Sequence, residues 1–333
     1  MKKRIAINGF GRIGRLCYRA LKGKENVELV AINDLTDTRT LAHLFKYDTA
    51  HRQVPYEVGY GEGFIRVDGH QIPAFAQKDS AALPWKDLGV DIVLECTGIN
   101  LSTETAGAHL TAGAARVILS APPKDDRIPT YVLGVNHQDI PASQQILSNA
   151  SCTTNCLSPL IKLIDEHWGI EFANMNTIHA YTQDQRLQDA PHKDLRRARA
   201  AAQNIIPTST GASKAVEAVY PGIKGKLLAS SYRVPVITGS LIELFCRVSK
   251  NADREEVNRI FREGSENEFR GIIRYSEDPL VSSDIIGDPH SAIFDSELTE
   301  AFGQLIKITA WYDNESGYSH RLADICALTA NML

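Results

Sequence analysis

Near its start the chain reads Arg4-Ile5-Ala6-Ile7-Asn8-Gly9-Phe10-Gly11-Arg12-Ile13-Gly14, an apolar run followed by a glycine-rich turn. In a G-x-G-x-x-G turn between a strand and a helix, the first glycine makes the tight turn, the second lets a pyrophosphate approach the backbone, and the third permits close helix–strand packing. The N-terminus of the following helix offers N–H groups to the phosphates. The stretch therefore predicts a dinucleotide-binding turn through Gly9, Gly11 and Gly14, with a glycine-rich turn that binds no ligand as the alternative.

An acidic residue, Asp34, follows Gly14 by 20 positions, at the end of an expected second strand, Val27–Asn33. A carboxylate at that place accepts hydrogen bonds from the ribose hydroxyls and repels a 2′-phosphate. The simpler interpretation of Asp34 is a polar turn residue at a strand end. Because strand, turn, helix and acid are in register, the pattern favours NAD as the cofactor.

The two halves of the chain differ in pattern. Over residues 1–150, short apolar runs alternate with amphipathic segments, which is typical of a parallel sheet covered by helices on both faces. The second half has long strand-like runs separated by few helices. We therefore predict an α/β, Rossmann-type dinucleotide-binding domain over residues 1–150 and an α+β catalytic domain with a mixed or antiparallel sheet over 151–315. A C-terminal helix at 316–333 is expected to pack back on the first domain.

The elements expected in the first half are strands at Arg4–Asn8, Val27–Asn33, Asp91–Thr97, Arg116–Ser120, Tyr131–Val135 and Gln145–Asn149, and helices at Arg12–Leu21, Thr38–Phe45 and Ser102–Ala112. In the second half we expect a helix from Ser151 to Gly169, strands at Leu227–Val236, Ser240–Val248 and Gln304–Tyr312, and a helical tail.

Composition excludes several classes of protein. The chain has 333 residues, with 36 Lys and Arg against 40 Asp and Glu, a net charge of −4. This mild acidity argues against a general nucleic-acid binder, whose domain is normally strongly basic. No apolar stretch approaches the roughly 18 residues that span a bilayer, and the basic start leads directly into a strand, without a signal-peptide pattern. We expect a cytoplasmic protein with no membrane segment.

Cysteine usage agrees with that compartment. Six cysteines are scattered along the chain without a repeated spacing, which suits reduced thiols in a cytosol. The only close pair is Cys152 and Cys156, and no second Cys or His pair completes a tetrahedral metal site. We therefore expect no metal.

A polar segment, Ser148–Cys156, places a thiol at the expected start of a helix. Ser151 is a suitable N-cap, so that Cys152 falls in the first turn, where the helix dipole stabilises a thiolate. The alternative is a buried cysteine that acts as a small apolar residue, but the Ser, Thr and Asn neighbours favour a reactive site. His179 ends a strand-like run and is the best candidate for the base that a thiol nucleophile needs. By spacing alone, a structural role for His179 is equally open.

Two further features predict anion binding. A basic cluster, His192–Arg199, is followed by Thr208-Ser209-Thr210-Gly211, and arginines, hydroxyls and glycine amides suit a small phosphate ester. A solvated basic turn is the alternative. Arg233 lies within the apolar run Tyr232–Val236, and a strand arginine among apolar neighbours requires an anionic partner.

Over essentially its whole length the sequence resembles phosphorylating glyceraldehyde-3-phosphate dehydrogenases. The stretches Ala-Ser-Cys-Thr-Thr-Asn-Cys and Trp-Tyr-Asp-Asn-Glu are the most diagnostic. The segments that carry the resemblance are Ile7–Arg15, Phe45–Asp48, Ser148–Cys156, His179–Thr182, Ile205–Gly211, Pro279–Asp284 and Trp311–Glu315.

The resemblance implies an NAD-dependent oxidoreductase that oxidises and phosphorylates glyceraldehyde 3-phosphate in glycolysis or gluconeogenesis. It implies a thioester on Cys152 with His179 as the base, inorganic phosphate as the second substrate, a homotetramer, and no dedicated nucleic-acid site. The implied cofactor contacts are Gly9, Gly11, Arg12, Ile13, Gly14, Asp34, Lys78, Ser120 and Asn314. The implied phosphate contacts are Ser151, Thr153, Thr210 and Gly211 at one site and Thr182 and Arg233 at the other, with Arg197 chosen over Arg196 and Arg199.

Some positions depart from the family pattern. Lys78 stands where many members carry Arg, and Val236–Gly239 replaces the more typical run after Arg233. Ala190 stands where members that prefer NAD often carry Leu, which leaves some NADP use open.

Three other functions fit the sequence less well. Erythrose-4-phosphate dehydrogenases are the nearest alternative, but they lack counterparts of Thr182 and Thr210-Gly211. Aspartate-semialdehyde dehydrogenases do not share the Trp-Tyr-Asp-Asn-Glu ending. A non-catalytic NAD- or RNA-binding module is disfavoured by the net charge and by the intact Cys152 and His179 pair.

Overall fold

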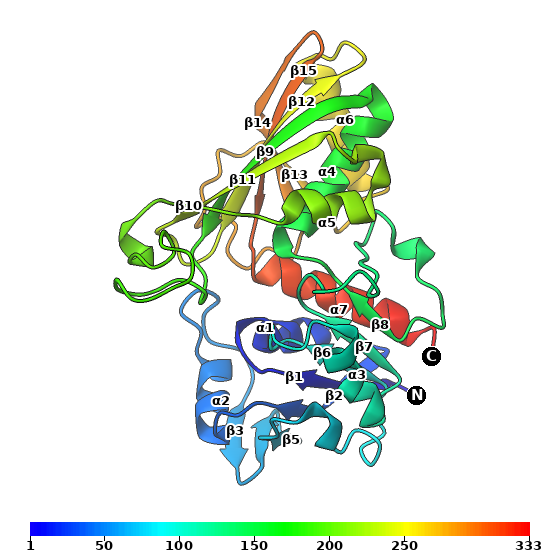
Figure 1. Cartoon of the computed structure of the whole chain (residues 1–333), viewed down its shortest axis with the longest axis vertical. Coiled ribbons are helices and arrows are strands. Elements are labelled where there is room, and N and C mark those ends of the chain that lie inside the picture. Colours follow the sequence, from blue (N-terminus) through cyan, green and yellow to red (C-terminus); the bar gives the residue numbers. More distant parts are fainter. The chain divides into compact units, whose positions relative to one another are not determined.

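The glycine turn forms as the sequence predicts, with β1 (Lys3–Asn8) leading through Gly9 into α1 (Arg12–Leu21). A computed structural model describes all 333 residues and divides into two units (Figure 1). The first comprises Met1–Tyr131, Asp139–Ala150 and Ser319–Leu333; the second comprises Val132–Gln138 and Ser151–Tyr318.

The first unit is built on an eight-stranded sheet with the order β3-β4-β5-β2-β1-β6-β7-β8. Strands β5 to β8 in this order are all parallel, and β3, β4 and β5 add an antiparallel meander at one edge. The remaining elements are β2 (Val27–Asn33), α2 (Thr38–Lys46), β3 (Val58–Gly61), β4 (Phe64–Val67), β5 (His70–Phe75), β6 (Ile92–Glu95), α3 (Thr103–Thr111), β7 (Arg116–Leu119) and β8 (Ile146–Ser148).

The order of the parallel strands reverses between β1 and β6, because the chain winds from β1 outward through β2 and later returns to β6 on the other side of β1. In open α/β sheets, ligands bind beyond the carboxyl ends of the strands at such a reversal. The glycine turn leaves β1 at this point, so the fold positions it for a nucleotide.

The second unit is built on a seven-stranded mixed sheet with the order β10-β11-β9-β12-β15-β14-β13. Helices α4 and α5 lie on one face of this sheet in Figure 1, and α4 supplies much of the core. The elements are α4 (Cys152–Trp168), β9 (Ile170–Ala180), β10 (Ile206–Thr208), α5 (Ala212–Val219), β11 (Leu227–Val234), β12 (Ser240–Val248), α6 (Arg254–Glu266), β13 (Ile273–Ser276), β14 (Ala292–Phe302) and β15 (Leu305–Tyr312). The last helix, α7 (Ser316–Ala330), begins in this unit, and its residues from Ser319 onward belong to the first unit.

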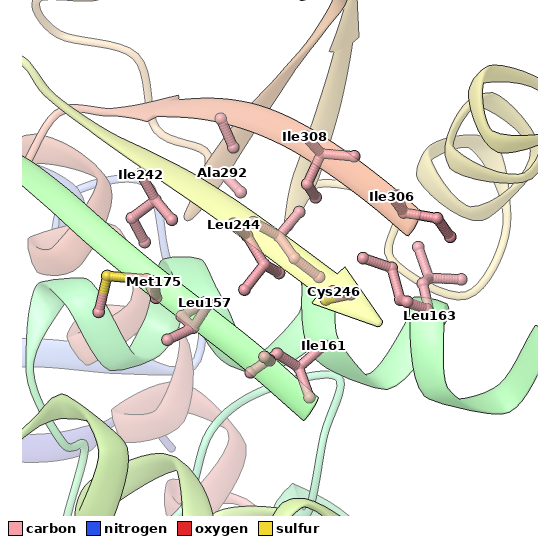
Figure 2. Close-up of a cluster of buried hydrophobic side chains, with 14 of the residues drawn as sticks. Leu157, Ile161, Leu163, Met175, Ile242, Leu244, Cys246, Ala292, Ile306 and Ile308 are labelled. Carbon is pink, nitrogen blue, oxygen red and sulfur yellow. The ribbon is translucent and has the colours of Figure 1, made fainter. Parts of the chain in front are cut away.

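The core of this unit follows from the alternation of side chains along the strands. Ile242, Leu244 and Cys246 take every second position of β12 and are buried, as are Ile306 and Ile308 on β15. Figure 2 shows these side chains gathered with Leu157 and Ile161 of α4. The helix that carries Cys152 at its start is therefore anchored along its length in a packed core.

The last residues of the chain belong to the first unit. The guanidinium of Arg116 donates to the carbonyl of Thr329 at 2.6 Å, and the amide of Asn26 donates to the carbonyl of Ala327 at 2.8 Å. These bonds hold the second half of α7 against β7 and the start of β2.

The predicted fold class is confirmed, but one expected strand is wrong. Residues Tyr131–Val135 form a turn, in which Val135 N–H donates to the carbonyl of Val132 and Val132 N–H donates to the side chain of Asn136. Gly134 has a φ of 82°, which an extended strand does not contain. The apolar side chains of this run predict a strand, but Gly134 allows the backbone to turn and the side chain of Asn136 stabilises that turn. No helix in the structure is both long and apolar enough to span a membrane.

Candidate active site

The thiol predicted to be the nucleophile lies at the N-terminus of α4. Ser151 caps the helix, and its Oγ accepts from Thr154 N–H at 3.2 Å. Cys152 is the first helical residue and is partly exposed. Ala150, just before the cap, has a φ of 57° and is fully buried, a backbone conformation rare for a residue with a Cβ. Such a conformation persists only where its surroundings impose it, as at functional sites.

The predicted base contacts this thiol. His179 lies near the end of β9 and its Nε2 is 3.5 Å from Cys152 Sγ. Its Nδ1 lies 2.6 Å from the carbonyl oxygen of Ala180 and also contacts the guanidinium of Arg233. Nε2 is the ring nitrogen that faces the thiol, which is the position that a general base requires.

Burial and the positive charge of Arg233 together shift the pKa values of Cys152 and His179. Burial, and then the charge of Arg233, lower the pKa of His179 to about 3, so its imidazole is neutral at pH 7. Burial raises the pKa of Cys152 above its usual value, and the Arg233 guanidinium and the hydrogen bonds of Thr153 oppose that rise. Arg233 therefore favours the thiolate and disfavours the imidazolium.

Strand pairing explains why Arg233 is there. β11 runs parallel to β9 and pairs Arg233 with His179. The Arg233 guanidinium donates to the Ala180 carbonyl at 3.0 Å and contacts Nδ1 of His179. β10 pairs antiparallel with β11 on its other side, with Ile206 opposite Arg233, so the segment that continues into Thr210 and Gly211 lies beside the same strand.

Tyr312 closes the inner side of the site. Its hydroxyl is 3.1 Å from Thr153 Oγ1 and 2.8 Å from Thr177 Oγ1, and it is almost fully buried. Its ring meets the His179 ring edge to face, with centroids 5.9 Å apart. Tyr312 thus connects the first turn of α4 to the strand that carries His179. The predicted contact Thr153 lies in this connection.

Among the arginines of the basic cluster, Arg197 makes the most contacts with neighbouring segments of the chain. Its Nε donates to Thr208 Oγ1 at 2.6 Å, its guanidinium pairs with Asp184, and it also donates to the Ser209 carbonyl. Arg196 is exposed, and Arg199 pairs with Asp189 at the surface. Arg197 is therefore the member of the cluster that joins the loop after His179 to the segment before Gly211.

Thr182, Thr210 and Gly211 complete the predicted phosphate contacts. The N–H of Thr182 donates to Gln185 Oε1 at 3.2 Å, and Gln185 is buried. Thr210 Oγ1 accepts from Ala212 N–H at 3.2 Å, at the start of α5, whose N-cap is Gly211. Neighbouring groups thus fix the backbone of Thr182 and the side-chain hydroxyl of Thr210.

The glycines of the first unit fit a nucleotide. A Cβ on Gly9, which has a φ of 90°, would lie 2.7 Å from Thr97 N, and a Cβ on Gly14 would lie 2.2 Å from the carbonyl oxygen of Gly9. Only glycine satisfies either position. A Cβ on Gly11 would meet nothing within 4 Å, so the backbone there faces open space. This arrangement matches the roles of the three glycines in a dinucleotide-binding turn.

The other predicted cofactor residues of this unit are placed as follows. Asp34 Oδ2 accepts from Phe10 N–H at 2.8 Å, so this carboxylate adjoins the turn. Arg12 and Ile13 open α1, and the Arg12 side chain pairs with Asp48 at 2.6 Å. Ser120 follows β7 at the same edge of the sheet. Lys78 is exposed and makes no hydrogen bond with the others.

Asn314 lies in the second unit, just after β15, and is 6% exposed. Its Oδ1 accepts from Ser240 Oγ at 2.9 Å, while Thr238 donates to the neighbouring Asp313 at 2.8 Å. No group of three or more His, Cys, Asp or Glu side chains is arranged to hold a metal ion.

Sequence reasoning did not single out three residues that shape this site, Tyr312, Ser240 and Gln185. Tyr312 lies within the Trp311–Glu315 segment, so its motif was noticed but its contacts were not. The other two act through hydroxyl or amide groups on residues distant in sequence, and no spacing rule connects them to Cys152 or Asn314.

A strand–turn–helix nucleotide site and a thiol beside a base define an enzyme that acts on carbonyl groups with a nicotinamide dinucleotide. The family models for glyceraldehyde 3-phosphate dehydrogenase match the chain, the NAD binding domain over residues 3–103 and the C-terminal domain over 151–314. The chain therefore belongs to the glyceraldehyde 3-phosphate dehydrogenase family. It is an NAD-dependent oxidoreductase.

Individual relatives agree over their full length. The chain is 53% identical to the glyceraldehyde-3-phosphate dehydrogenases of Mycobacterium avium and of Mycobacterium tuberculosis H37Rv, over 340 residues in each case and with all of both chains covered. It is 51% identical, over 336 residues and again with full coverage, to glyceraldehyde-3-phosphate dehydrogenase 2 of Streptomyces avermitilis.

Proposed function

We propose that the chain oxidises glyceraldehyde 3-phosphate with NAD⁺ and transfers the oxidised carbon to inorganic phosphate, forming 1,3-bisphosphoglycerate. The observation that carries the proposal is the contact of 3.5 Å between Cys152 Sγ and His179 Nε2 at the start of α4. A thiol beside a base at a helix N-terminus suits covalent catalysis on a carbonyl carbon. Relatives that match over their full length bear the name of this activity.

The chemistry begins with the thiol. Cys152 forms a C–S bond to the aldehyde carbon, while His179 accepts the thiol proton at Nε2 and passes it to the carbonyl oxygen, giving a thiohemiacetal. His179 then removes the hydroxyl proton as hydride leaves the same carbon. NAD⁺, when bound, supplies the hydride acceptor. The product is a thioester on Cys152; phosphate attacks it, the C–S bond breaks, and the thiolate is released.

Two anions are held in this scheme, the phosphate of the substrate and the attacking phosphate. We assign Thr182 and Arg233 to one and Ser151, Thr153, Thr210 and Gly211 to the other, and we include Arg197 as the substrate-binding member of the arginine cluster. The support is that Arg197 donates to Thr208 Oγ1 of β10 at 2.6 Å, and that β10 pairs with β11, the strand that carries Arg233. Arginines and hydroxyls arranged around backbone amides are suited to phosphate.

The cofactor residues proposed in the first unit are Gly9, Gly11, Arg12, Ile13, Gly14, Asp34, Lys78 and Ser120. The open backbone at Gly11 admits a pyrophosphate, and Asp34, which adjoins the turn, suits a ribose without a 2′-phosphate. Asn314 is proposed to hold the carboxamide of the nicotinamide. Residues 1–150 and 151–315 are accordingly proposed as the NAD-binding and catalytic domains, with the helix at 316–333 serving the first.

We further propose that the enzyme is a cytoplasmic homotetramer. The sheet of the second unit leaves large apolar side chains exposed on β9, β11 and β12, namely Phe172, Leu228 and Phe245. Apolar side chains grouped on one sheet commonly mark a protein interface. All six cysteines are free, in keeping with a reducing compartment. The retained Thr182 and Thr210-Gly211 do not favour erythrose 4-phosphate as substrate.

The proposal is tested by following NADH absorbance with glyceraldehyde 3-phosphate, NAD⁺ and phosphate, beside reactions that contain erythrose 4-phosphate or NADP⁺. We expect phosphate-dependent turnover of the triose phosphate, no turnover by Cys152→Ser, and a loss of about 10²–10⁴-fold for His179→Asn. Cys156→Ser is the matched control, since Cys156 is buried one helical turn further on. Turnover by Cys152→Ser at the wild-type rate would exclude the proposed nucleophile.

A further inference from the structure

The buried hydroxyl of Ser240 contacts both Asn314 and Ala180, the residue that follows the proposed base His179 at the end of β9. Ser240 is the first residue of β12 and is 1% exposed. Its Oγ accepts from the backbone N–H of Ala180 at 3.0 Å, and it lies 2.9 Å from Asn314 Oδ1. A backbone N–H only donates, so Ser240 Oγ is the acceptor in the first bond. In the second bond Ser240 Oγ donates to Asn314 Oδ1.

This bond determines which way round the Asn314 amide lies. The oxygen and nitrogen of a side-chain amide have nearly the same shape, so their positions follow from the hydrogen-bond network. In the structure the oxygen of Asn314 faces the Ser240 hydroxyl, so the NH₂ group is the end that remains to donate. A nicotinamide carboxamide presents a carbonyl oxygen, which needs such a donor.

The neighbouring Asp313 holds the backbone but does not decide the amide. Its Oδ1 accepts from Thr238 Oγ1 at 2.8 Å and from the N–H groups of Glu315 and Ser316, and its Oδ2 accepts from Gly287 N–H. Thr238 has one proton and gives it to Asp313 at the shorter distance, since its oxygen is 3.4 Å from Asn314 Oδ1. Ser240 is thus the principal donor to Asn314.

The second partner of Ser240 is Ala180, which also contacts the proposed base His179. The Ala180 carbonyl is 2.6 Å from Nδ1 of His179 and accepts from Arg233 at 3.0 Å, while Ala180 N–H donates to Ser240. Ala180 therefore orients the imidazole on one side and Ser240 on the other.

We propose that Ser240 is a positioning residue, which sets the orientation of the Asn314 amide so that its NH₂ recognises the nicotinamide carboxamide, in register with His179. The proposal rests on the proposed function of Asn314. It predicts that Ser240 affects recognition of the nicotinamide part of the cofactor and not of the adenosine and pyrophosphate part.

The test compares NAD⁺ with ADP-ribose, which lacks the nicotinamide, by calorimetric titration of the full-length enzyme. For Ser240→Ala we expect NAD⁺ to bind about 3–10-fold more weakly, as for one lost hydrogen bond, while ADP-ribose binds as to wild type. Asn314→Ala should show the same selective loss, and the double variant should bind NAD⁺ no more weakly than Asn314→Ala alone. Ser231→Ala, which removes another buried serine from the same sheet, is the control and should change neither affinity.

Each other outcome has a defined meaning. An equal loss for both nucleotides, or no loss for Ser240→Ala while Asn314→Ala loses NAD⁺, overturns the role of Ser240. An unchanged NAD⁺ affinity in Asn314→Ala overturns the assignment of Asn314 and the Ser240 proposal with it. If Ser240→Ala does not fold, Ser240→Cys keeps a side chain of similar size with a weaker donor and should show the same selective loss, and its absence overturns the proposal.

Discussion

At the scale of single residues, the site depends on where one positive charge lies. Arg233 is paired with His179 across parallel strands, so its guanidinium sits on the Nδ1 side of the imidazole and within electrostatic range of the thiol. A positive charge there stabilises a thiolate and opposes an imidazolium. The same residue is proposed to bind phosphate, so substrate binding and thiol acidity are connected through Arg233.

Replacing Arg233 by Gln should therefore make Cys152 less acidic. Arg233 lowers the pKa of Cys152, and its removal raises that pKa; each unit of increase lowers the thiolate fraction below the pKa about tenfold. The rate of carboxamidomethylation of Cys152 by iodoacetamide increases with pH as the thiolate forms. We expect this increase to occur at a higher pH in the variant than in wild type. Arg196→Gln, at an exposed position, is the control. Superimposable pH profiles for wild type and Arg233→Gln would rule out this role.

At the scale of elements, both functional centres lie where strands or helices begin or end. The thiol begins α4, His179 lies near the end of β9, and the glycine turn leaves β1. Beneath that turn, the buried Glu95 at the end of β6 accepts from Asn8 at 2.6 Å and from Thr97 N–H at 2.8 Å. It also contacts His109 Nε2 at 3.0 Å. These bonds join the ends of β1 and β6 below the nucleotide site.

The ion state of Glu95 should make the first unit sensitive to acid. Burial raises the pKa of Glu95, but hydrogen bonds from His109, Thr97 and Asn8 outweigh burial and leave the pKa below its usual value. A depressed pKa contributes stability above the unfolded value, about 4.3, and that stability is lost as the pH falls through the folded value. Glu95→Gln should be destabilised by about 1.5–3 kcal/mol at pH 7.

The measurement is the urea midpoint of apo enzyme at pH 7 and at pH 4. The difference in urea midpoint between wild type and Glu95→Gln should be smaller at the lower pH, because only wild type has a carboxylate at position 95 that can be protonated. A difference in urea midpoint that is independent of pH would show that the charge of Glu95 does not contribute to stability. Glu62→Gln, which replaces an exposed carboxylate in the same unit, should leave the pH dependence close to that of wild type.

The N-cap of α4 gives a second prediction at this scale. Ser151→Ala removes the acceptor for Thr154 N–H, which should cost about 1 kcal/mol of stability. Ser151→Asp keeps an acceptor and should restore that stability, although its charge lies next to the thiol and should slow turnover. Thermal unfolding and steady-state rates separate the two effects; equal stability of all three proteins would contradict the capping role.

How much of this was predictable depends on distance along the chain. The strand–turn–helix, its glycines and the helix start at Cys152 follow local rules, and they were predicted. Strands β3 to β5 were not, because four to six residues of mixed polarity at a sheet edge carry little pattern. The contacts of Tyr312 with Thr153 and of Ser240 with Ala180 join residues 159 and 60 positions apart. Only the folded sheet brings those residues together.

At the scale of the whole molecule, the exposed apolar residues of the second unit require an explanation in terms of partners. Phe245 on β12 is 42% exposed and Leu228 on β11 is 60% exposed. The net charge of −4 is small enough not to oppose self-association strongly. The proposed homotetramer would cover these apolar side chains at its interfaces.

Light scattering after size exclusion should give a mass of four times the 36.7 kDa of the chain. Phe245→Asp should reduce that mass, because it places a charge in an apolar interface. Leu44→Asp, on α2 of the first unit, is the control and should remain assembled. A wild-type protein that is monomeric at micromolar concentration would contradict the assembly.

The most direct test of the account is a single-turnover reaction of glyceraldehyde 3-phosphate and NAD⁺ without phosphate. The account predicts a burst of NADH that approaches one per chain, followed by a slow rate, and a peptide in which Cys152 carries a 3-phosphoglyceroyl group. Added phosphate should release that group and start continuous turnover. Continuous NADH formation without phosphate, or the acyl group on a residue other than Cys152, would contradict the account.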